Sequence, residues 1–196
     1  MIRVLLDTNA YLRLAKRIRP LLGVTFGQKR YTLTILKQVE DEVFKSARLK
    51  FHYPWFTEAE FDKERLSKRI RLSSDEREAI DAATSILRAH VLADTSAYTS
   101  HGRSPPSPTD CFLLAFAQVR ESILVTDDLG MHLLAKEFDI DIWHGHELLK
   151  RMIGAKVISN DLVREIFSAL EDNNDLPRSW QEVRHTVFKK LFGLKS

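Results

Sequence analysis

Short apolar runs that alternate with helical stretches constrain the fold of this chain more than any other feature. Buried strands are predicted where apolar and β-branched residues gather, at residues 2–6, 31–35, 122–126 and 140–143. Helical periodicity is predicted around them, at residues 9–18, 36–49, 58–71, 74–93, about 110–121 and 130–137. Strands that alternate with helices are typical of an α/β domain with a mainly parallel central sheet.

The remaining segments are interpreted as a cap, a loop and a helical tail. Thr8 or Asn9 is expected to cap the first helix, because each follows a strand and precedes helical periodicity. Residues 94–109 are rich in serine and proline, so we expect a loop there. Residues 144–196 look helical, with breaks at Gly154 and at the polar segment 172–177.

Length and composition favour a globular chain in a reducing compartment. The 196 residues suit one domain with additions, and 44% hydrophobic with 29% charged residues can bury a core. No run approaches the roughly 18–20 apolar residues of a membrane span, and the first residues do not resemble a secretory signal. The single cysteine, Cys111, cannot form an internal disulfide or a zinc cluster. We therefore expect a cytoplasmic protein.

Positive charge is mild overall but locally concentrated. The net charge is +3, and the densest basic stretch is residues 63–71. Lys68, Arg69 and Arg71 would contact the substrate if it carried phosphates. The alternative, an ordinary solvated helix face, is the commoner role of a charge run.

Acidic residues recur where the predicted strands end or the following helices begin. Asp7 directly follows the first strand, much as Asp127 and Asp128 follow the strand at 122–126. The other acids lie near the start of predicted helices: Glu40 and Glu42, and Asp110. Strand carboxyl ends and helix starts meet at one rim of a parallel sheet, which is where such folds place function.

Each acid also has a purely structural interpretation. Asp7 would cap the next helix, and Asp110 would form a capping box with Ser107. Acids in a first helical turn are favoured by the helix dipole. These interpretations stay open beside the functional one, which explains why the acids fall at the same rim.

Clustered carboxylates predict a metal site. They repel one another unless cations neutralise them or their pKa values rise. Oxygen ligands without cysteine or histidine favour Mg²⁺ or Mn²⁺ over zinc. Two such ions, roughly 3.5–4 Å apart, activate a water and stabilise the leaving oxygen of a phosphodiester. The pattern therefore predicts metal-dependent hydrolysis of a nucleic acid.

Four segments resemble the PIN-domain nucleases, a family that includes the toxin nucleases of VapC-type toxin–antitoxin pairs and several RNA-processing enzymes. In order, the segments are VLLDTNAYLRL, VEDEVF, PTDCFLLAFA and ILVTDDLGMHLLAKEF. The resemblance spans roughly residues 2–143, and its most specific parts are the opening DTN and the later T-x-D. It implies a three-layer α/β/α fold, Mg²⁺ or Mn²⁺ in an acidic pocket, and endonucleolytic cleavage of RNA.

The resemblance also assigns roles to individual residues. It implies catalytic acids at Asp7, Glu42, Asp110 and Asp128. It implies metal ligands at Asp7, Asp110, Asp127 and Asp128, with supporting roles for Asn9 and Thr126. Glu40 lies nearer the middle of its helix's apolar face than Glu42 does, so the choice between these two stays open. The direct ligand is likewise left open between Asp127 and Asp128.

The resemblance divides the chain and suggests its partners. Residues 1–143 would be the nuclease domain with a helical insertion at about 50–106, and 144–196 a C-terminal helical extension packed on the same domain. These additions would form a substrate clamp, a dimer contact or a seat for an antitoxin. The expected partners are RNA, an antitoxin protein if the chain is a toxin, and a second copy in a homodimer.

Two alternative functions fit parts of the pattern. A haloacid dehalogenase-like phosphatase also begins with a strand ending in Asp, but its usual Asp-x-Asp is replaced here by Asp7-x-Asn9, and Asn cannot donate the proton. A PIN-like RNA- or protein-binding module without catalysis is the other alternative, and the retained acids count against it. His144-x-His146 resembles a metal-ligand pair, although no third ligand is evident nearby.

Overall fold

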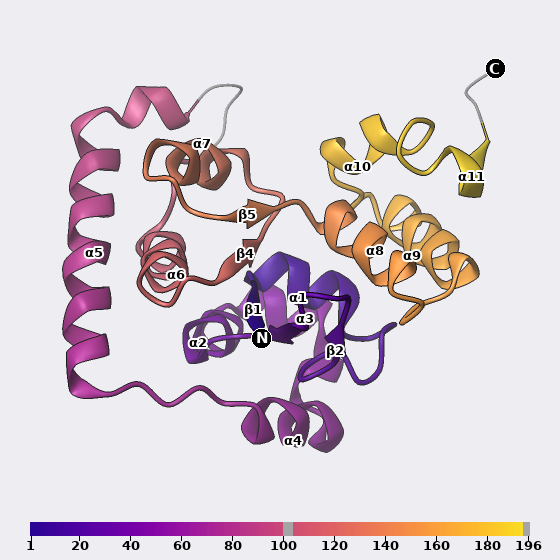
Figure 1. Cartoon of the computed structure of the whole chain (residues 1–196), viewed down its shortest axis with the longest axis horizontal. Helices are drawn as coiled ribbons and strands as arrows, with labels where there is room; N and C mark the ends of the chain where they lie inside the picture. Colours follow the sequence, from indigo (N-terminus) through magenta and orange to yellow (C-terminus); the bar gives the residue numbers. More distant parts are fainter. Residues whose placement is uncertain (100–103, 194–196) are drawn as a thin grey trace.

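A five-stranded sheet lies at the centre of the computed structural model, which describes residues 1–99 and 104–193 (Figure 1). Its strands are β1 (Ile2–Leu6), β2 (Thr25–Phe26), β3 (Tyr31–Thr34), β4 (Ile123–Val125) and β5 (Ile142–Trp143). The order across the sheet is β2-β3-β1-β4-β5. All neighbouring pairs are parallel except β2 and β3, which are antiparallel. The prediction of an α/β fold with a mainly parallel sheet is confirmed.

Helices make up most of the rest of the described chain. They are α1 (Thr8–Leu14), α2 (Lys37–Lys45), α3 (Ala47–His52), α4 (Ala59–Ser67), α5 (Ser74–Ala93), α6 (Pro108–Val119), α7 (Leu129–Glu137), α8 (Gly145–Gly154), α9 (Asn160–Asp172), α10 (Arg178–Val183) and α11 (Lys189–Phe192). Two short 3₁₀ turns are η1 (Pro54–Thr57) and η2 (Thr95–Tyr98). Among the described residues, no helix is long and apolar enough to cross a membrane.

The direction of the crossovers explains the three layers. The chain leaves β1 through α1 to β3 on one side, then crosses back over β1 through α6 to β4. Because such crossovers are right-handed, opposite directions place α1 and α6 on opposite faces of the sheet. Helix α5 packs along α6, and α9 packs against α1. Figure 1 shows α5 and α6 to the left of the strands and α8 and α9 to the right.

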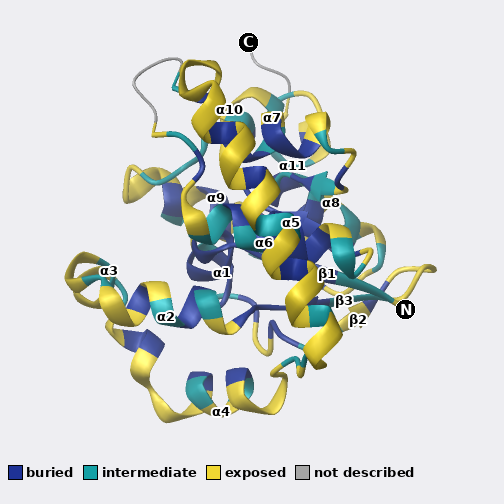
Figure 2. Ribbon diagram, turned by 90° about the vertical axis from the view of Figure 1, so that its left-hand side faces the viewer, coloured by how far each residue is buried: buried dark blue, intermediate teal, exposed yellow. Residues whose placement is uncertain are grey.

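The core sits between these layers. Val4, Leu5 and Leu6 of β1 are fully buried, as expected of a strand covered by helices on both faces. Helix α6 is buried over most of its surface. Figure 2 shows the buried residues gathering around the strands, whereas the outer faces of the surrounding helices are exposed. Each fully buried leucine stabilises the fold by about 1.5–3 kcal/mol relative to an exposed one.

Some expectations about the bounds of strands and helices were wrong. Strand β2 was missed because two residues show no periodicity. The helix expected at 36–49 divides at Ser46, whose Oγ accepts a hydrogen bond from the Leu49 N–H at 3.2 Å and so caps α3. The helix expected at 58–71 ends at Ser67, and an extended segment leads from there to α5.

The additions to the sheet domain have a definite arrangement. Within 50–106 lie the end of α3, then η1, α4, α5 and η2, while residues 100–103 fall outside the described part. Within 144–196 lie α8 to α11, with breaks after Gly154 and at 173–177, and residues 194–196 are likewise outside it. Because α9 packs on α1, the C-terminal extension lies against the sheet domain.

Candidate active site

Asp7 follows β1 directly and is held by two hydrogen bonds. Its Oδ1 accepts from the Ala10 N–H at 2.5 Å, so Asp7 itself caps α1. The expectation that Thr8 or Asn9 would be this cap is wrong, because the helix begins one residue earlier. The Oδ2 of Asp7 accepts from the Thr126 hydroxyl at 2.5 Å. Both oxygens of a 6% exposed side chain are therefore fixed in place.

Burial makes the charged form of Asp7 costly. Desolvation raises the pKa of Asp7 to about 7, although the hydrogen bonds from Thr126 and Ala10 act in the opposite direction. The negative charge of Asp127 raises it further, and Arg13 lowers it. A serine would cap α1 without burying a charge. Capping alone therefore does not explain a carboxylate at this position.

Thr126 connects Asp7 to Asp128. Its buried hydroxyl donates to Asp7 and accepts from the Asp128 N–H at 3.1 Å. Asp128 in turn caps α7, because its Oδ1 accepts from the Met131 N–H at 2.9 Å. The Asp128 side chain is exposed. The ends of β1 and β4 thus bring the first and fourth predicted acids to one rim.

Asp110 forms the expected capping box at the start of α6. The Asp110 N–H donates to Ser107 Oγ at 3.2 Å, and the Ser107 N–H donates to Asp110 Oδ2 at 2.7 Å. Burial raises the pKa of Asp110, and the charges of Asp128 and Glu42 raise it further. These effects indicate that Asp110 lies near both acids.

The structure gives the side chains of Glu42 and Glu40 different surroundings. Glu42 is exposed, and its Oε2 accepts a hydrogen bond from the Thr8 hydroxyl at 2.6 Å, next to Asp7. Glu40 is buried, as its place on the apolar face indicated, but it pairs with Arg65 Nε at 3.4 Å and Arg69 Nη2 at 3.2 Å. The geometry therefore favours Glu42 as the acid that belongs to the rim.

The Asp127 side chain accepts hydrogen bonds from residues of the C-terminal extension. Both of its carboxylate oxygens lie 2.9 Å from Trp180 Nε1, and Oδ1 also accepts from the Gly145 N–H and the Ser179 hydroxyl at 3.2 Å each. Arg13 Nη1 lies 3.5 Å from Oδ2. Burial acts to raise the pKa of Asp127, but the nearby His144, Arg13 and Trp180 lower it overall. Because both oxygens of Asp127 are already occupied, the exposed Asp128 carboxylate is the freer of the two to contact a ligand at this rim.

A cavity of about 920 Å³ opens beside these acids. Asp7, Asn9 and Asp128 line one part of it. Its cations come from three separate elements: Arg13, Lys136 and Arg178. The extension supplies a wall through residues 177–179. Sequence reasoning missed Arg13, Trp180 and Arg178, because no spacing pattern links the extension to the rim.

The histidines near the cavity stack on one another. The ring centroids of His132 and His144 are 3.8 Å apart, and those of His144 and His146 are 5.2 Å apart, with nearly parallel planes. Burial, and then the neighbouring His144, lower the pKa of His146 to about 4. Across residues 1–99 and 104–193, no three Asp, Glu, His or Cys side chains converge closely enough to hold an ion together.

Several other side chains lie away from the acidic rim. The rings of Trp55 and Phe56 are buried against Tyr11, so they pack in the core. Cys111 is also a buried core residue. The basic residues Lys68, Arg69 and Arg71 line a hollow beside β3 with Met1 and Arg3 rather than the cavity at the acids.

Comparisons with known proteins give one weak structural likeness and no match in sequence. No family model matches the chain, and no curated protein matches it significantly. Among solved structures, the fold is similar to the crystal structure of FitAcB from Neisseria gonorrhoeae. The sequence identity is 14% and the TM-score 0.45, over 72% of this chain and 97% of that chain. A likeness at this level does not establish what this chain does.

Proposed function

We propose that this chain is a metal-dependent endoribonuclease of the PIN type, with Asp7, Glu42, Asp110 and Asp128 as its catalytic acids. One observation carries the proposal. The starts of α1, α6 and α7 each present an aspartate at the same rim, and Glu42 reaches it from α2 through Thr8. Uncharged residues would cap these helices equally well, so capping does not account for the shared charge.

Mg²⁺ or Mn²⁺ suits the donors at this rim. Carboxylate oxygens are the ligands these hard cations prefer, and Asp7, Asp110 and Asp128 would hold the ion with Glu42 alongside. Since no three of them already converge, the more exposed side chains of Glu42 and Asp128 would turn toward it. When bound, the ion would activate a water and neutralise charge on the phosphate.

The protein's own residues would position the substrate. Asp7 cannot rotate freely, because Thr126 and Ala10 hold both of its oxygens. Of the cations that line the adjacent cavity, Arg13 pairs with Asp175 and Asp127, and Arg178 pairs with Glu182. Lys136 is therefore the cation there best placed to attract an RNA backbone. An antitoxin, a homodimer and a cytoplasmic location remain predictions from the sequence.

A labelled-RNA cleavage assay tests the proposal. Wild type should cleave with Mn²⁺ and not with EDTA, and Asp7→Asn or Asp128→Asn should lower the rate by about a hundredfold or more. Asp139→Asn is the matched control, because Asp139 is exposed and has a positive φ that asparagine tolerates. Wild-type activity in both site variants, or cleavage that survives EDTA, would contradict the proposal.

A thermal-shift titration tests the ion separately. An ion that binds only the folded chain stabilises it by about 2.7 kcal/mol at one hundred times its dissociation constant. Mn²⁺ should raise the melting temperature of wild type and of Asp139→Asn. A shift of the same size in an Asp7→Asn, Asp128→Asn double variant would place the ion elsewhere.

A further inference from the structure

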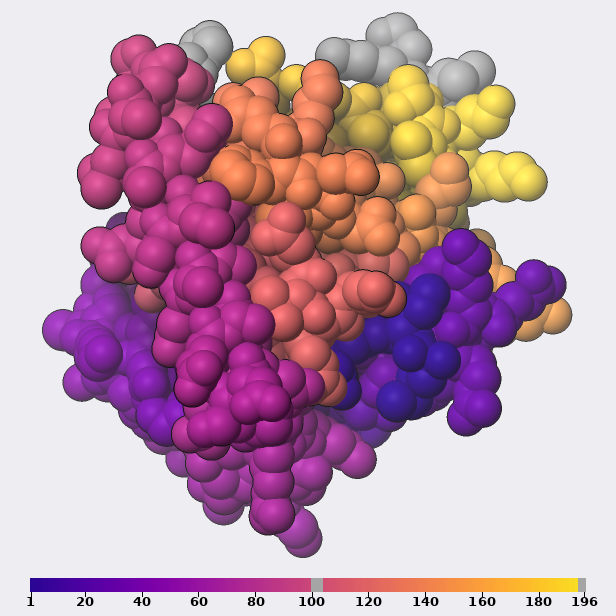
Figure 3. Space-filling model, turned by 60° about the vertical axis from the view of Figure 1, so that its left-hand side comes forward, coloured from indigo at the N-terminus to yellow at the C-terminus, as the bar shows by residue number. Residues whose placement is uncertain are grey.

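A second cavity, of about 590 Å³, lies between α2, α5, α6 and the extended segment that joins α4 to α5. Figure 3 shows α5, in magenta, as a ridge along this face of the molecule. The cavity combines cations with an apolar wall. Its lining includes Arg71 and Arg77 together with Leu36, Leu72 and Phe112. None of these residues belongs to the acidic rim.

The charges in this cavity are only partly neutralised. Arg69 pairs with Glu40 and Lys37 with Asp41. Among the described residues, no carboxylate lies within ion-pair distance of Arg71 or Arg77. Asp81 is the one acid that the described residues contribute to the lining. The cavity therefore carries an excess of positive charge, which suits an anion.

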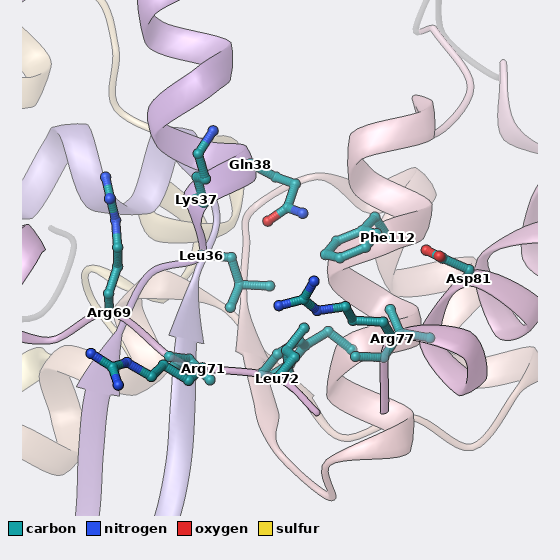
Figure 4. Close-up of a pocket in the computed structure, with 12 residues that line it drawn as sticks. Leu36, Lys37, Gln38, Arg69, Arg71, Leu72, Arg77, Asp81 and Phe112 are labelled. Atoms are coloured by element: carbon teal, nitrogen blue, oxygen red, sulfur yellow. The ribbon is translucent and has the colours of Figure 1, made fainter. Parts of the chain in front are cut away.

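The arrangement of the side chains adds a flat apolar surface. Figure 4 shows the Arg77 guanidinium, the Gln38 amide and the Phe112 ring turned toward one another, with Arg69 and Arg71 beyond Leu36 in this view. The start of α2 also lines the cavity, and its cap residue Leu36 makes no side-chain hydrogen bond to the helix. The first N–H groups of α2 add to the positive potential that the arginines create.

Gln38 connects this cavity to the proposed active site. It also lines a smaller hollow of about 380 Å³, together with Glu42 and Thr109. Thr109 directly precedes Asp110. The two hollows therefore share Gln38, and the smaller one is lined by Glu42, one of the proposed catalytic acids.

We propose that the arginine-lined cavity binds a nucleotide of the RNA strand next to the cleaved phosphodiester. One phosphate contacts Arg77 and the next phosphate of the strand contacts Arg71, while the base stacks beside Phe112 within reach of the Gln38 amide. The proposal rests on the proposed function, since it assigns a binding site to the same substrate. It gives Arg71 the phosphate-binding role expected from the sequence, in a cavity separate from the one lined by Asp7 and Asp128.

Binding of a fluorescent twelve-nucleotide RNA in EDTA tests this site without cleavage. For single strands, each phosphate that a cationic side chain neutralises adds about 0.7 to the slope of log affinity against log salt. An Arg71→Gln, Arg77→Gln double variant should therefore have a slope smaller by about 1.4 and bind about tenfold more weakly at low salt. The charge-matched control, Arg48→Gln, Arg88→Gln, removes two exposed arginines that do not line this cavity and should bind like wild type.

Phe112→Leu separates stacking from charge. It keeps an apolar side chain at the wall, so it should weaken affinity by about tenfold while the salt slope stays at its wild-type value, because stacking on an aromatic ring is not ionic. An unchanged slope in the arginine variant, an equally reduced slope in the control, or no RNA binding by wild type would overturn the cavity proposal.

Failure of the nuclease proposal and failure of the cavity proposal give different results in these experiments. If wild type binds RNA in EDTA with these arginine and Phe112 effects, and yet cleaves no RNA with Mn²⁺, the cavity is supported and the nuclease proposal is not. If wild type cleaves RNA while the arginine variant binds with an unchanged slope, the nuclease proposal stands and the cavity proposal fails.

Discussion

The ends of β1 and β4 carry two aspartates with opposite surroundings. Asp7 accepts hydrogen bonds from neutral groups only, and burial raises its pKa to about 7. Asp127 is equally hidden from solvent, but Arg13, Trp180 and their neighbours lower its pKa. Position on the sheet therefore does not decide the role of an acid. The partners decide how the charge is stabilised, and Asp7 lacks the ion pair that Arg13 makes with Asp127.

Removing the Asp127 carboxylate should have the largest effect on stability. Asp127→Ala leaves the Arg13 guanidinium short of one partner and the Trp180 N–H without an acceptor, so we expect a loss of about 3–5 kcal/mol of unfolding free energy. Urea unfolding followed by circular dichroism measures it. A loss below about 1 kcal/mol would mean that the extension is held by apolar packing alone.

Asp7→Asn should change stability in the opposite direction. Because the pKa of Asp7 in the folded chain lies above its ordinary 3.8, the stability that this group contributes is complete below pH 3.8 and is lost as the pH rises through about 7. Asparagine has no such charge, so metal-free Asp7→Asn should be more stable than wild type at pH 8, on the order of 2 kcal/mol.

The pH dependence of this stability difference distinguishes Asp7 from Asp127. The advantage of Asp7→Asn should shrink between pH 8 and pH 5, measured by urea unfolding in EDTA. Asp127 has a lowered pKa, so its contribution is present above its ordinary value and declines only as the pH falls below it. An Asp7→Asn variant that is less stable than wild type at pH 8 would contradict the cost that burial assigns to the Asp7 charge.

Gly145→Ala should disturb the extension without touching a charge. A methyl group at Gly145 would lie 2.6 Å from the Trp180 ring and 3.1 Å from Asp127 Oδ2. Trp180 would have to move, and overpacking of this kind costs about 1–2 kcal/mol. Gly154→Ala is the control, because nothing lies within 4 Å of the added methyl group. Equal unfolding free energies for the two variants would contradict the close packing of Gly145 on Trp180.

The sequence could predict the strands and buried faces, because these depend on local pattern. It could not predict ion pairs and hydrogen bonds between residues far apart in the chain. The four parallel strands followed from their apolar runs, and the direction of the chain placed the acids at one rim. The burial of Glu40 was also readable from the helix face, but its pairing with Arg65 and Arg69 was not. Likewise, nothing in the spacing of Trp180 indicated that its indole would reach Asp127.

The smallest expected effect concerns Ser179, whose hydroxyl donates to Asp127 at 3.2 Å. Ser179→Ala removes one hydrogen bond among several, so it should cost about 0.5–1.5 kcal/mol. A double-mutant cycle assigns that cost to a partner. In the Asp127→Ala background the Ser179 substitution should cost almost nothing, whereas in the Asp7→Asn background its cost should be unchanged. A cost that disappears with Asp7 rather than with Asp127 would mean that the extension is coupled to the acid of β1, and the contrast between the two strand ends would no longer hold.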